Sequence, residues 1–230
     1  MSTIAQHLQD VHARMADAAS QAGRSPHDIT LLAVSKTKPA GDVEAAFAAG
    51  QRWFGENYVQ EAVDKITTLK KRCPDIVWHL IGPLQSNKSR PVAEHFDWVQ
   101  TVDRLKIAQR LNDQRPPHMH PLNICLQVNI SGEASKSGLS PAEAEALADE
   151  VAALPRLCLR GLMAIPEATD NSDTLRVQLL ELKHLFDRMK KKHPQMDTLS
   201  MGMSNDLELA VACGSTLVRV GTAIFGSRNP

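Results

Sequence analysis

Residues 121–165 read PLNICLQVNISGEASKSGLSPAEAEALADEVAALPRLCLRGLMAI, and this stretch decides the fold class. It begins with an apolar run of strand length, 121–130, and ends with a second one, 157–165. Between them, Ser140-Pro141-Ala142-Glu143 forms a capping box with proline at the first helical position, which predicts the start of a helix. Both runs are apolar on both faces, as strands of a parallel sheet covered by helices are. The stretch therefore predicts a strand–helix–strand unit.

The same alternation continues in both directions from this stretch. Apolar residues at helical spacing predict a helix over 4–22 that packs outside the sheet. The eight predicted strands, each followed by a helix or helical turn, cover 29–36, 51–55, 76–82, 97–102, 121–130, 157–165, 198–202 and 216–221. Eight such units predict a closed (β/α)8 barrel of the TIM type, with an open doubly wound sheet as the alternative. No linker interrupts the pattern, so we expect one domain over 1–230.

The composition limits the classes of function. Lys plus Arg and Asp plus Glu number 26 each, so no net charge attracts nucleic acid or an anionic membrane. Hydrophobic residues make up 43%, enough for a full core, but no apolar run approaches the roughly 18 residues of a membrane span. The first residues lack the layout of a signal peptide, and the four cysteines are far apart without a CxxC pair. We expect a cytoplasmic protein with reduced thiols and no metal site.

Lys36 stands at the end of the first predicted strand, where a barrel carries its functional groups. Side chains alternate along a strand, so Lys36 shares a face with Leu32 and Val34. If these two side chains fill the barrel, Lys36 points into its mouth. Burial there disfavours the charged ammonium and leaves the amine free to attack a carbonyl. The alternative is a lysine that extends to the rim and stays solvated.

Two loops at the same end of the predicted barrel could hold a phosphate monoester. Strand seven leads into 200–204, Ser-Met-Gly-Met-Ser, and strand eight into Arg-Val-Gly-Thr, 219–222. Gly221 lets the backbone approach an anion closely, while Ser200 and Thr222 supply hydroxyls. Tight turns and helix caps would explain the same residues. Both loops together, opposite a buried lysine, favour a phosphorylated carbonyl ligand.

Arg219 shares a strand face with Leu217 and is predicted to point into the barrel, where a buried guanidinium needs a partner. That partner could be a ring nitrogen or a carboxylate of a ligand. The alternative is a structural ion pair with an acid on a neighbouring strand.

Other candidates are weaker. His79 lies within the third predicted strand and is expected to be a core histidine. His118 and His120 have no acidic or cysteine partner nearby, so a solvated loop is favoured over a metal site. Lys136, in a polar loop after the fifth strand, could reach over the barrel mouth.

Seven motifs, spread over nearly the whole chain, resemble those of the pyridoxal phosphate homeostasis protein family. They are LLAVSKTKP, WFGENYVQE, WHLIGPLQSNK, QVNIS with SKSG, LRGLMAIP, LSMGMSNDLELA and GSTLVRVGTAIFGSR. The resemblance implies a barrel similar to the N-terminal domain of alanine racemase, with pyridoxal 5'-phosphate (PLP) as its cofactor.

The resemblance also assigns roles to residues of this chain. Lys36 resembles the lysine that carries PLP as a Schiff base, and Asn57 a residue of the cofactor pocket. Arg219 resembles the partner of the pyridine nitrogen. Ser200, Gly221 and Thr222 resemble the phosphate cradle.

The function implied is a monomeric binding protein, without catalytic residues, that holds PLP and delivers it to apo-enzymes. The alternative is a PLP-dependent racemase, which needs a second base on the opposite face of the cofactor. The sequence disfavours it, because Tyr58 is the single tyrosine and the chain ends at Pro230, directly after the last barrel element. An arginine at the ring nitrogen also makes the cofactor a weak electron sink. A Schiff-base aldolase for phosphosugars would share Lys36, but no general-acid constellation is evident.

Overall fold

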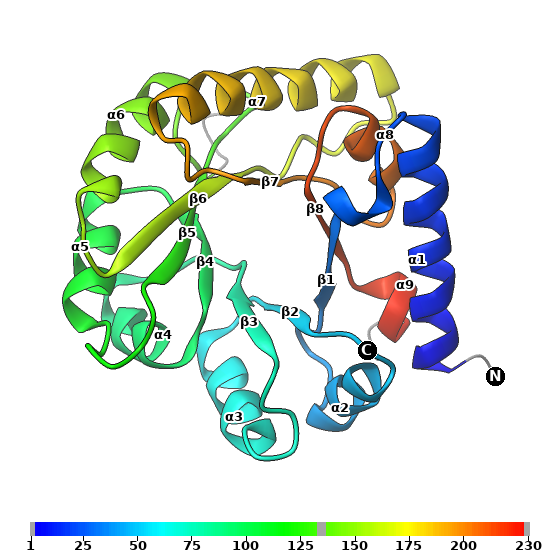
Figure 1. The fold of residues 1–230 in the computed structure, drawn as a ribbon, viewed down its shortest axis with the longest axis horizontal. Helices are drawn as coiled ribbons and strands as arrows, with labels where there is room; N and C mark the ends of the chain where they lie inside the picture. The colour runs from blue at the N-terminus through cyan, green and yellow to red at the C-terminus, as the bar shows by residue number, and fades with distance from the viewer. Residues whose placement is uncertain (1–2, 133–136, 228–230) are drawn as a thin grey trace.

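The computed structural model describes residues 3–132 and 137–227, and its strands close into one parallel barrel (Figure 1). Each strand pairs with its successor, and β8 pairs with β1. The strands are β1 (Thr30–Val34), β2 (Trp53–Glu56), β3 (Val77–Leu80), β4 (Trp98–Val102), β5 (Leu122–Gln127), β6 (Leu157–Met163), β7 (Thr198–Ser200) and β8 (Leu217–Val220). The closed barrel confirms the predicted fold class, and the pairing of β1 with β8 excludes the open sheet.

Helices surround the barrel on its outside (Figure 1). They are α1 (Ile4–Gln21), α2 (Ala40–Ala48), α3 (Val59–Leu69), α4 (Ser89–His95), α5 (Leu105–Gln114), α6 (Pro141–Ala152), α7 (Ser172–Lys192), α8 (Leu207–Ala212) and the single turn α9 (Thr222–Phe225). Two short 3-10 helices, η1 (Pro26–Asp28) and η2 (Ser86–Lys88), lie in the connections. The predicted capping box of α6 is present in full, with both reciprocal hydrogen bonds between Ser140 and Glu143.

Ser204, in the loop after β7, is of a residue type that often caps helices, but α8 starts farther along the chain. The helix begins at Leu207, with Asp206 at the N-cap position. The Asp206 carboxylate accepts the backbone N–H of Met203 at 2.6 Å, which holds the preceding residues in a separate turn. A local side-chain-to-backbone bond has therefore shifted the helix start by a few residues.

The barrel interior is filled by side chains from alternate strand positions. Leu32, Ile81 and Leu217 form one interior cluster, against which Val34 and Trp53 pack. A second interior cluster contains Trp98, Cys125 and Met163. The larger core lies between the strands and the surrounding helices. The clusters show that Leu32 and Val34 face the barrel interior, the condition on which the predicted direction of Lys36 depends.

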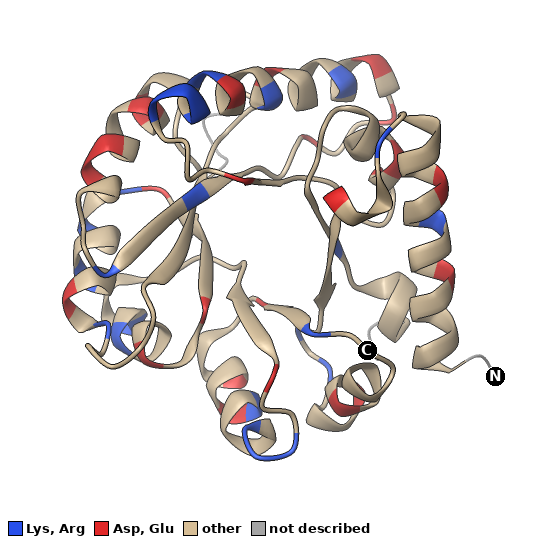
Figure 2. Cartoon of the chain, viewed as in Figure 1, with Lys and Arg blue, Asp and Glu red and all other residues tan. Residues whose placement is uncertain are grey.

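Helix α1 lies outside the ring and packs against α8 and α9 (Figure 1). Arg14 of α1 forms an ion pair with Glu208 of α8, and the ring of His7 contacts the Ile224 carbonyl oxygen at 2.8 Å. Figure 2 shows acidic and basic residues interleaved along the outer helices, α7 in particular. Among the described residues, no helix combines the length and apolar character needed to cross a membrane.

Candidate functional site

The loops that carry the predicted site residues meet at the carboxyl ends of β1 and β8. Leu32 pairs with Arg219 across these strands. A methyl group placed on Gly221 would lie 3.2 Å from the carbonyl oxygen of Val34, so β8 passes very close to the end of β1. Lys36 lies two residues after Val34 in the chain. The closure of the barrel thus brings the Lys36 turn next to the loop that holds Gly221 and Thr222.

The Ser35 side chain, next to Lys36, faces the surrounding helices. Ser35 is fully buried, and its hydroxyl donates to Glu56 Oε1 at 2.6 Å. Lys65 of α3 contacts the same carboxylate oxygen, so this contact lies between the strands and the helices, outside the barrel. Ser35 therefore faces outward, and the half-buried Lys36 follows it in the turn after β1.

Arg219 lies inside the barrel, with 4% of its surface exposed. It donates from Nη1 to the Ser200 hydroxyl at 2.7 Å and from Nη2 to the Ala164 carbonyl oxygen at 3.0 Å. Within the described residues it forms no ion pair, so the expected alternative of an acid on a neighbouring strand is not found. Burial lowers the pKa of Arg219 to about 10, which leaves it cationic at neutral pH. A buried cation held by neutral groups can take a further acceptor without giving up an ion pair.

A hydrogen-bonded chain runs from Arg219 across the barrel interior. The Ser200 hydroxyl donates to Gln100 Oε1 at 2.6 Å, and Gln100 Nε2 lies 2.9 Å from Nδ1 of His79. Arginine can only donate, so the Ser200 hydroxyl oxygen accepts from Arg219 and its O–H group donates to Gln100. The Gln100 amide nitrogen then donates to His79. The chain links β8, β7, β4 and β3 in one fixed direction.

His79 ends this chain as a neutral ring. It is fully buried, and burial, with a smaller effect of Arg160, holds its pKa well below the ordinary value. Its Nδ1 accepts from Gln100, so the proton is on Nε2, which is buried without a partner in the described structure. The ring stacks on Trp98, with 4.9 Å between centroids. His79 is therefore a core residue, as expected, but one that is tied to Arg219.

Ser200 and Thr222, the two hydroxyl residues predicted to hold a phosphate, differ in their surroundings. The Ser200 hydroxyl is fully buried and bonded to Gln100 and Arg219, rather than displayed at the loop surface. Thr222, by contrast, is exposed at the start of α9. The two glycines of these loops have packing reasons of their own, because added methyl groups would meet the Ala210 side chain at Gly202 and Val34 at Gly221.

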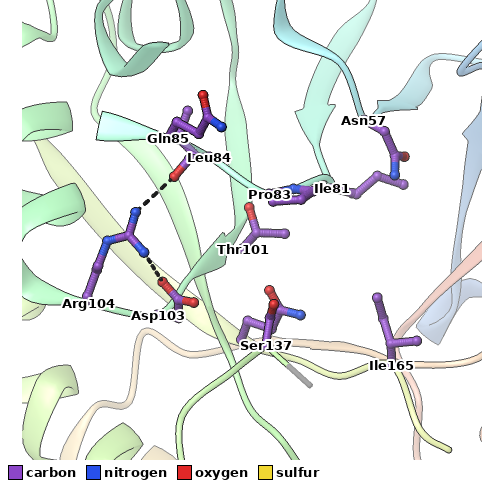
Figure 3. Close-up of a pocket in the computed structure, with 11 residues that line it drawn as sticks. Asn57, Ile81, Pro83, Leu84, Gln85, Thr101, Asp103, Arg104, Ser137 and Ile165 are labelled. Carbon is purple, nitrogen blue, oxygen red and sulfur yellow. Dashed lines mark hydrogen bonds and ion pairs between the residues drawn. The ribbon is translucent and has the colours of Figure 1, made fainter. Parts of the chain in front are cut away.

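A cavity of about 430 Å³ opens at the carboxyl ends of β2 to β6 (Figure 3). Asn57 is the predicted site residue on its wall, with Ile81, Thr101 and Arg104 among the others. The Oδ1 atom of Asn57 is buried without a hydrogen-bond partner in the described structure. The backbone of Asn57 packs directly against Gly82. A methyl group added to Gly82 would lie 2.2 Å from the Asn57 carbonyl oxygen. An unpaired acceptor on a cavity wall is suited to a ligand that donates a hydrogen bond.

Several residues around the site were not singled out by the sequence. Glu56, Lys65 and Gln100 are buried polar side chains whose partners come from other elements. Their sequence context gave no functional signal, although Glu56 and Lys65 fall in or near a recognised motif. Lys136 lies outside the described residues. In the parts of the chain that the structure describes, no three metal-ligating side chains cluster.

Nearly the whole length of this chain matches known proteins in sequence and in fold. The family model for the N-terminal domain of alanine racemase matches residues 7–229. The pyridoxal phosphate homeostasis protein of Escherichia coli K12 is 56% identical over 231 residues, which cover 100% of this chain and 98% of the relative.

Two solved structures show that the similarity extends to the three-dimensional fold. PipY of Synechococcus elongatus, solved with PLP bound, has a TM-score of 0.80 and 39% identity over 92% of this chain and 100% of its own. An alanine racemase of Clostridium difficile has a TM-score of 0.72 over 95% of this chain and 57% of its own, at 15% identity, and so shares the fold. This chain belongs to the pyridoxal phosphate homeostasis protein family, whose barrel is that of the alanine racemase N-terminal domain.

Proposed function

We propose that this protein binds PLP as a Schiff base on Lys36 and delivers it to apo-enzymes, without catalytic turnover of its own. The observation that carries the proposal is the buried Arg219, a cation held inside the barrel by neutral groups. The E. coli relative is named for pyridoxal phosphate homeostasis, and PipY was solved with PLP bound. Both support the same ligand for this chain.

The residues at the barrel mouth fit the three functional parts of PLP. The amine of Lys36 would bind the aldehyde carbon, and the guanidinium of Arg219 would donate to the ring nitrogen. The phosphate would lie against the loops after β7 and β8, where Gly221 and Thr222 are. Ser200 would act through Arg219, whose guanidinium it holds. Asn57 would supply its unpaired oxygen at the cavity wall.

The position of Arg219 favours binding over catalysis. When bound, PLP supplies an aldehyde that reacts reversibly with amines, and its ring withdraws electrons strongly when the nitrogen is protonated. Arg219 is a donor only, so it keeps that nitrogen unprotonated. The pocket therefore holds the cofactor but does little to labilise the α-proton of an amino acid.

The racemase alternative lacks support from the described residues. Tyr58, the single tyrosine, is 53% exposed at the start of α3 rather than enclosed beside Lys36. The solved alanine racemase is 15% identical to this chain, a level at which the likeness shows the fold and not the activity. In our proposal the protein acts in the cytoplasm as a monomer, and its partners are PLP and apo-enzymes rather than nucleic acid or membranes. Its four free cysteines fit a reducing compartment.

The attachment site is tested by reduction with borohydride. The purified protein, incubated with PLP, should absorb visible light, and borohydride should bleach the band and fix the ligand. Tryptic mass spectrometry should then place a phosphopyridoxyl group on the peptide with Lys36. A group found on other lysines alone, with Lys36→Ala still coloured, would overturn the assignment.

Delivery is tested with an apo-aminotransferase as acceptor. A pyridoxal phosphate phosphatase is added so that PLP released into solution is destroyed. The loaded protein should restore aminotransferase activity under these conditions, whereas an equal amount of free PLP should not. If neither the loaded protein nor free PLP restored aminotransferase activity, delivery would be refuted, whereas the proposal of PLP binding would stand.

A further inference from the structure

The turn that carries Lys36 rests on a buried cluster of charged side chains from β2 and α3. Lys65 has 6% of its surface exposed. Its ammonium donates to the Ser35 carbonyl oxygen at 2.7 Å, to Glu56 Oε1 at 2.8 Å and to Glu61 Oε1 at 2.6 Å. All three donor positions of the ammonium are thus used, and one of them holds the backbone of the residue before Lys36.

The same carboxylates hold both neighbours of Lys36. The Ser35 hydroxyl donates to Glu56 at 2.6 Å, and the backbone N–H of Thr37 donates to Glu61 at 2.7 Å. Thr37 has a left-handed backbone, with φ of 63°, which a β-branched residue adopts only when its surroundings enforce it. Lys36 is therefore the residue between two backbone positions that are fixed from outside the barrel.

This arrangement is not explained by stability alone. A buried ion pair gains little over well-packed apolar side chains, because removing the charges from water costs about as much as their attraction returns. Glu56 is fully buried, and its second carboxylate oxygen has no partner in the described structure. An apolar contact between α3 and β2 would be the simpler way to dock the helix, but it could not hold Ser35 and Thr37.

We infer that Glu56, Glu61 and Lys65 are positioning residues that hold the amine of Lys36 at the barrel mouth. None of the three is expected to touch the ligand. They fix the turn from its outer side, so the amine returns to the same place each time PLP leaves. This inference rests on the proposed function, since it assigns a purpose to the position of Lys36.

Glu61→Ala is the most informative variant. The Glu61 side chain is 30% exposed, and its removal leaves the Lys65–Glu56 pair in place, so the fold should survive. Glu61→Gln keeps an oxygen acceptor for the Thr37 amide and should rescue the native behaviour. Asp187→Ala is the matched control, because it removes the acid of another i,i+4 pair, Lys183–Asp187 on α7.

Two measurements separate positioning from a structural role. Hydrogen–deuterium exchange of the ligand-free protein reports on the Thr37 amide directly, and trapping of released PLP by phosphatase gives its dissociation rate. We expect Glu61→Ala to raise both rates about tenfold, the factor that about 1.4 kcal/mol represents. Glu61→Gln and Asp187→Ala should stay within about twofold of the native protein, well under 1.4 kcal/mol.

A native dissociation rate in Glu61→Ala would overturn the inference, whether or not the amide exchanges faster. Equal effects of Asp187→Ala would overturn it as well, because general loss of stability would then explain both rates. Absence of any adduct on Lys36 in the native protein is a different result, seen before variants are compared, and would refute the proposed function together with this inference.

Discussion

The Arg219 guanidinium donates to the Ser200 hydroxyl at 2.7 Å inside the barrel, and the hydroxyl in turn donates to Gln100. These two residues lie on β8 and β7. Their contact fixes the orientation of Arg219 without an ion pair, and in our proposal this guanidinium donates to the ring nitrogen of PLP.

Ser200→Ala should weaken PLP binding through Arg219. The change removes the acceptor of Nη1 and leaves Gln100 Oε1 without its donor. We expect about tenfold weaker binding in a titration and a loss of about 1–3 kcal/mol in the free energy of unfolding. Ser89→Ala is the control, because Ser89 is also fully buried but bonds to Ser86 and Gln114. Equal PLP affinities of the two variants would contradict the role of Ser200.

The neutral state of His79 predicts how stability depends on pH. Its pKa in the folded protein lies well below 6.5, so the unfolded chain binds a proton near pH 6 that the folded protein refuses. This contribution destabilises the native protein as pH falls below about 6.5, by up to about 1.4 kcal/mol per pH unit. Urea unfolding between pH 7 and pH 5 should show a flatter profile for His79→Gln. The exposed His118→Gln is the control, and identical profiles for all three proteins would be inconsistent with a neutral His79.

The phosphate of PLP should supply much of the affinity. A protein with no net charge holds a dianion through local donors, and each charge-assisted hydrogen bond contributes about 1.5–3 kcal/mol. Unphosphorylated pyridoxal should therefore bind far more weakly than PLP in parallel titrations. Thr222→Ala should reduce the difference in binding affinity between PLP and pyridoxal. If the native protein bound both equally well, the proposed phosphate loops would be wrong.

Gly82→Ala should displace the turn that holds Asn57. A methyl group at Gly82 would lie 2.2 Å from the Asn57 carbonyl oxygen, a backbone atom that cannot move without the turn. We expect at least about tenfold weaker PLP binding, equal to about 1.4 kcal/mol. Gly41→Ala is the matched control, since a methyl group there meets nothing within 4 Å. Unchanged PLP affinity in Gly82→Ala would remove Asn57 from the proposed pocket.

The sequence predicts the barrel because each strand and helix is specified locally. The alternation of side chains along β1 and β8 likewise predicts that Leu32, Val34 and Arg219 lie on the interior face, as the structure shows. The partners of Ser200 could not be predicted, because Gln100 is 100 residues away and meets it across the closed barrel.

Lys65 illustrates the same limit on a helix. Together with Glu61 it has the spacing of an ordinary exposed i,i+4 pair, and nothing local indicates burial. The packing of α3 against the ends of β1 and β2 converts that pair into the support of the Lys36 turn.

Exchange of the α-proton of alanine in deuterated water tests most directly whether this protein is a carrier or an enzyme. Proton NMR would follow alanine incubated with the PLP-loaded native protein and with Arg219→Glu, which places an acceptor near the ring nitrogen. We predict negligible exchange with the native protein and detectable exchange with Arg219→Glu, provided that this variant still binds PLP. Exchange by the native protein at rates typical of enzymes, roughly 1–1000 per second, would contradict the account.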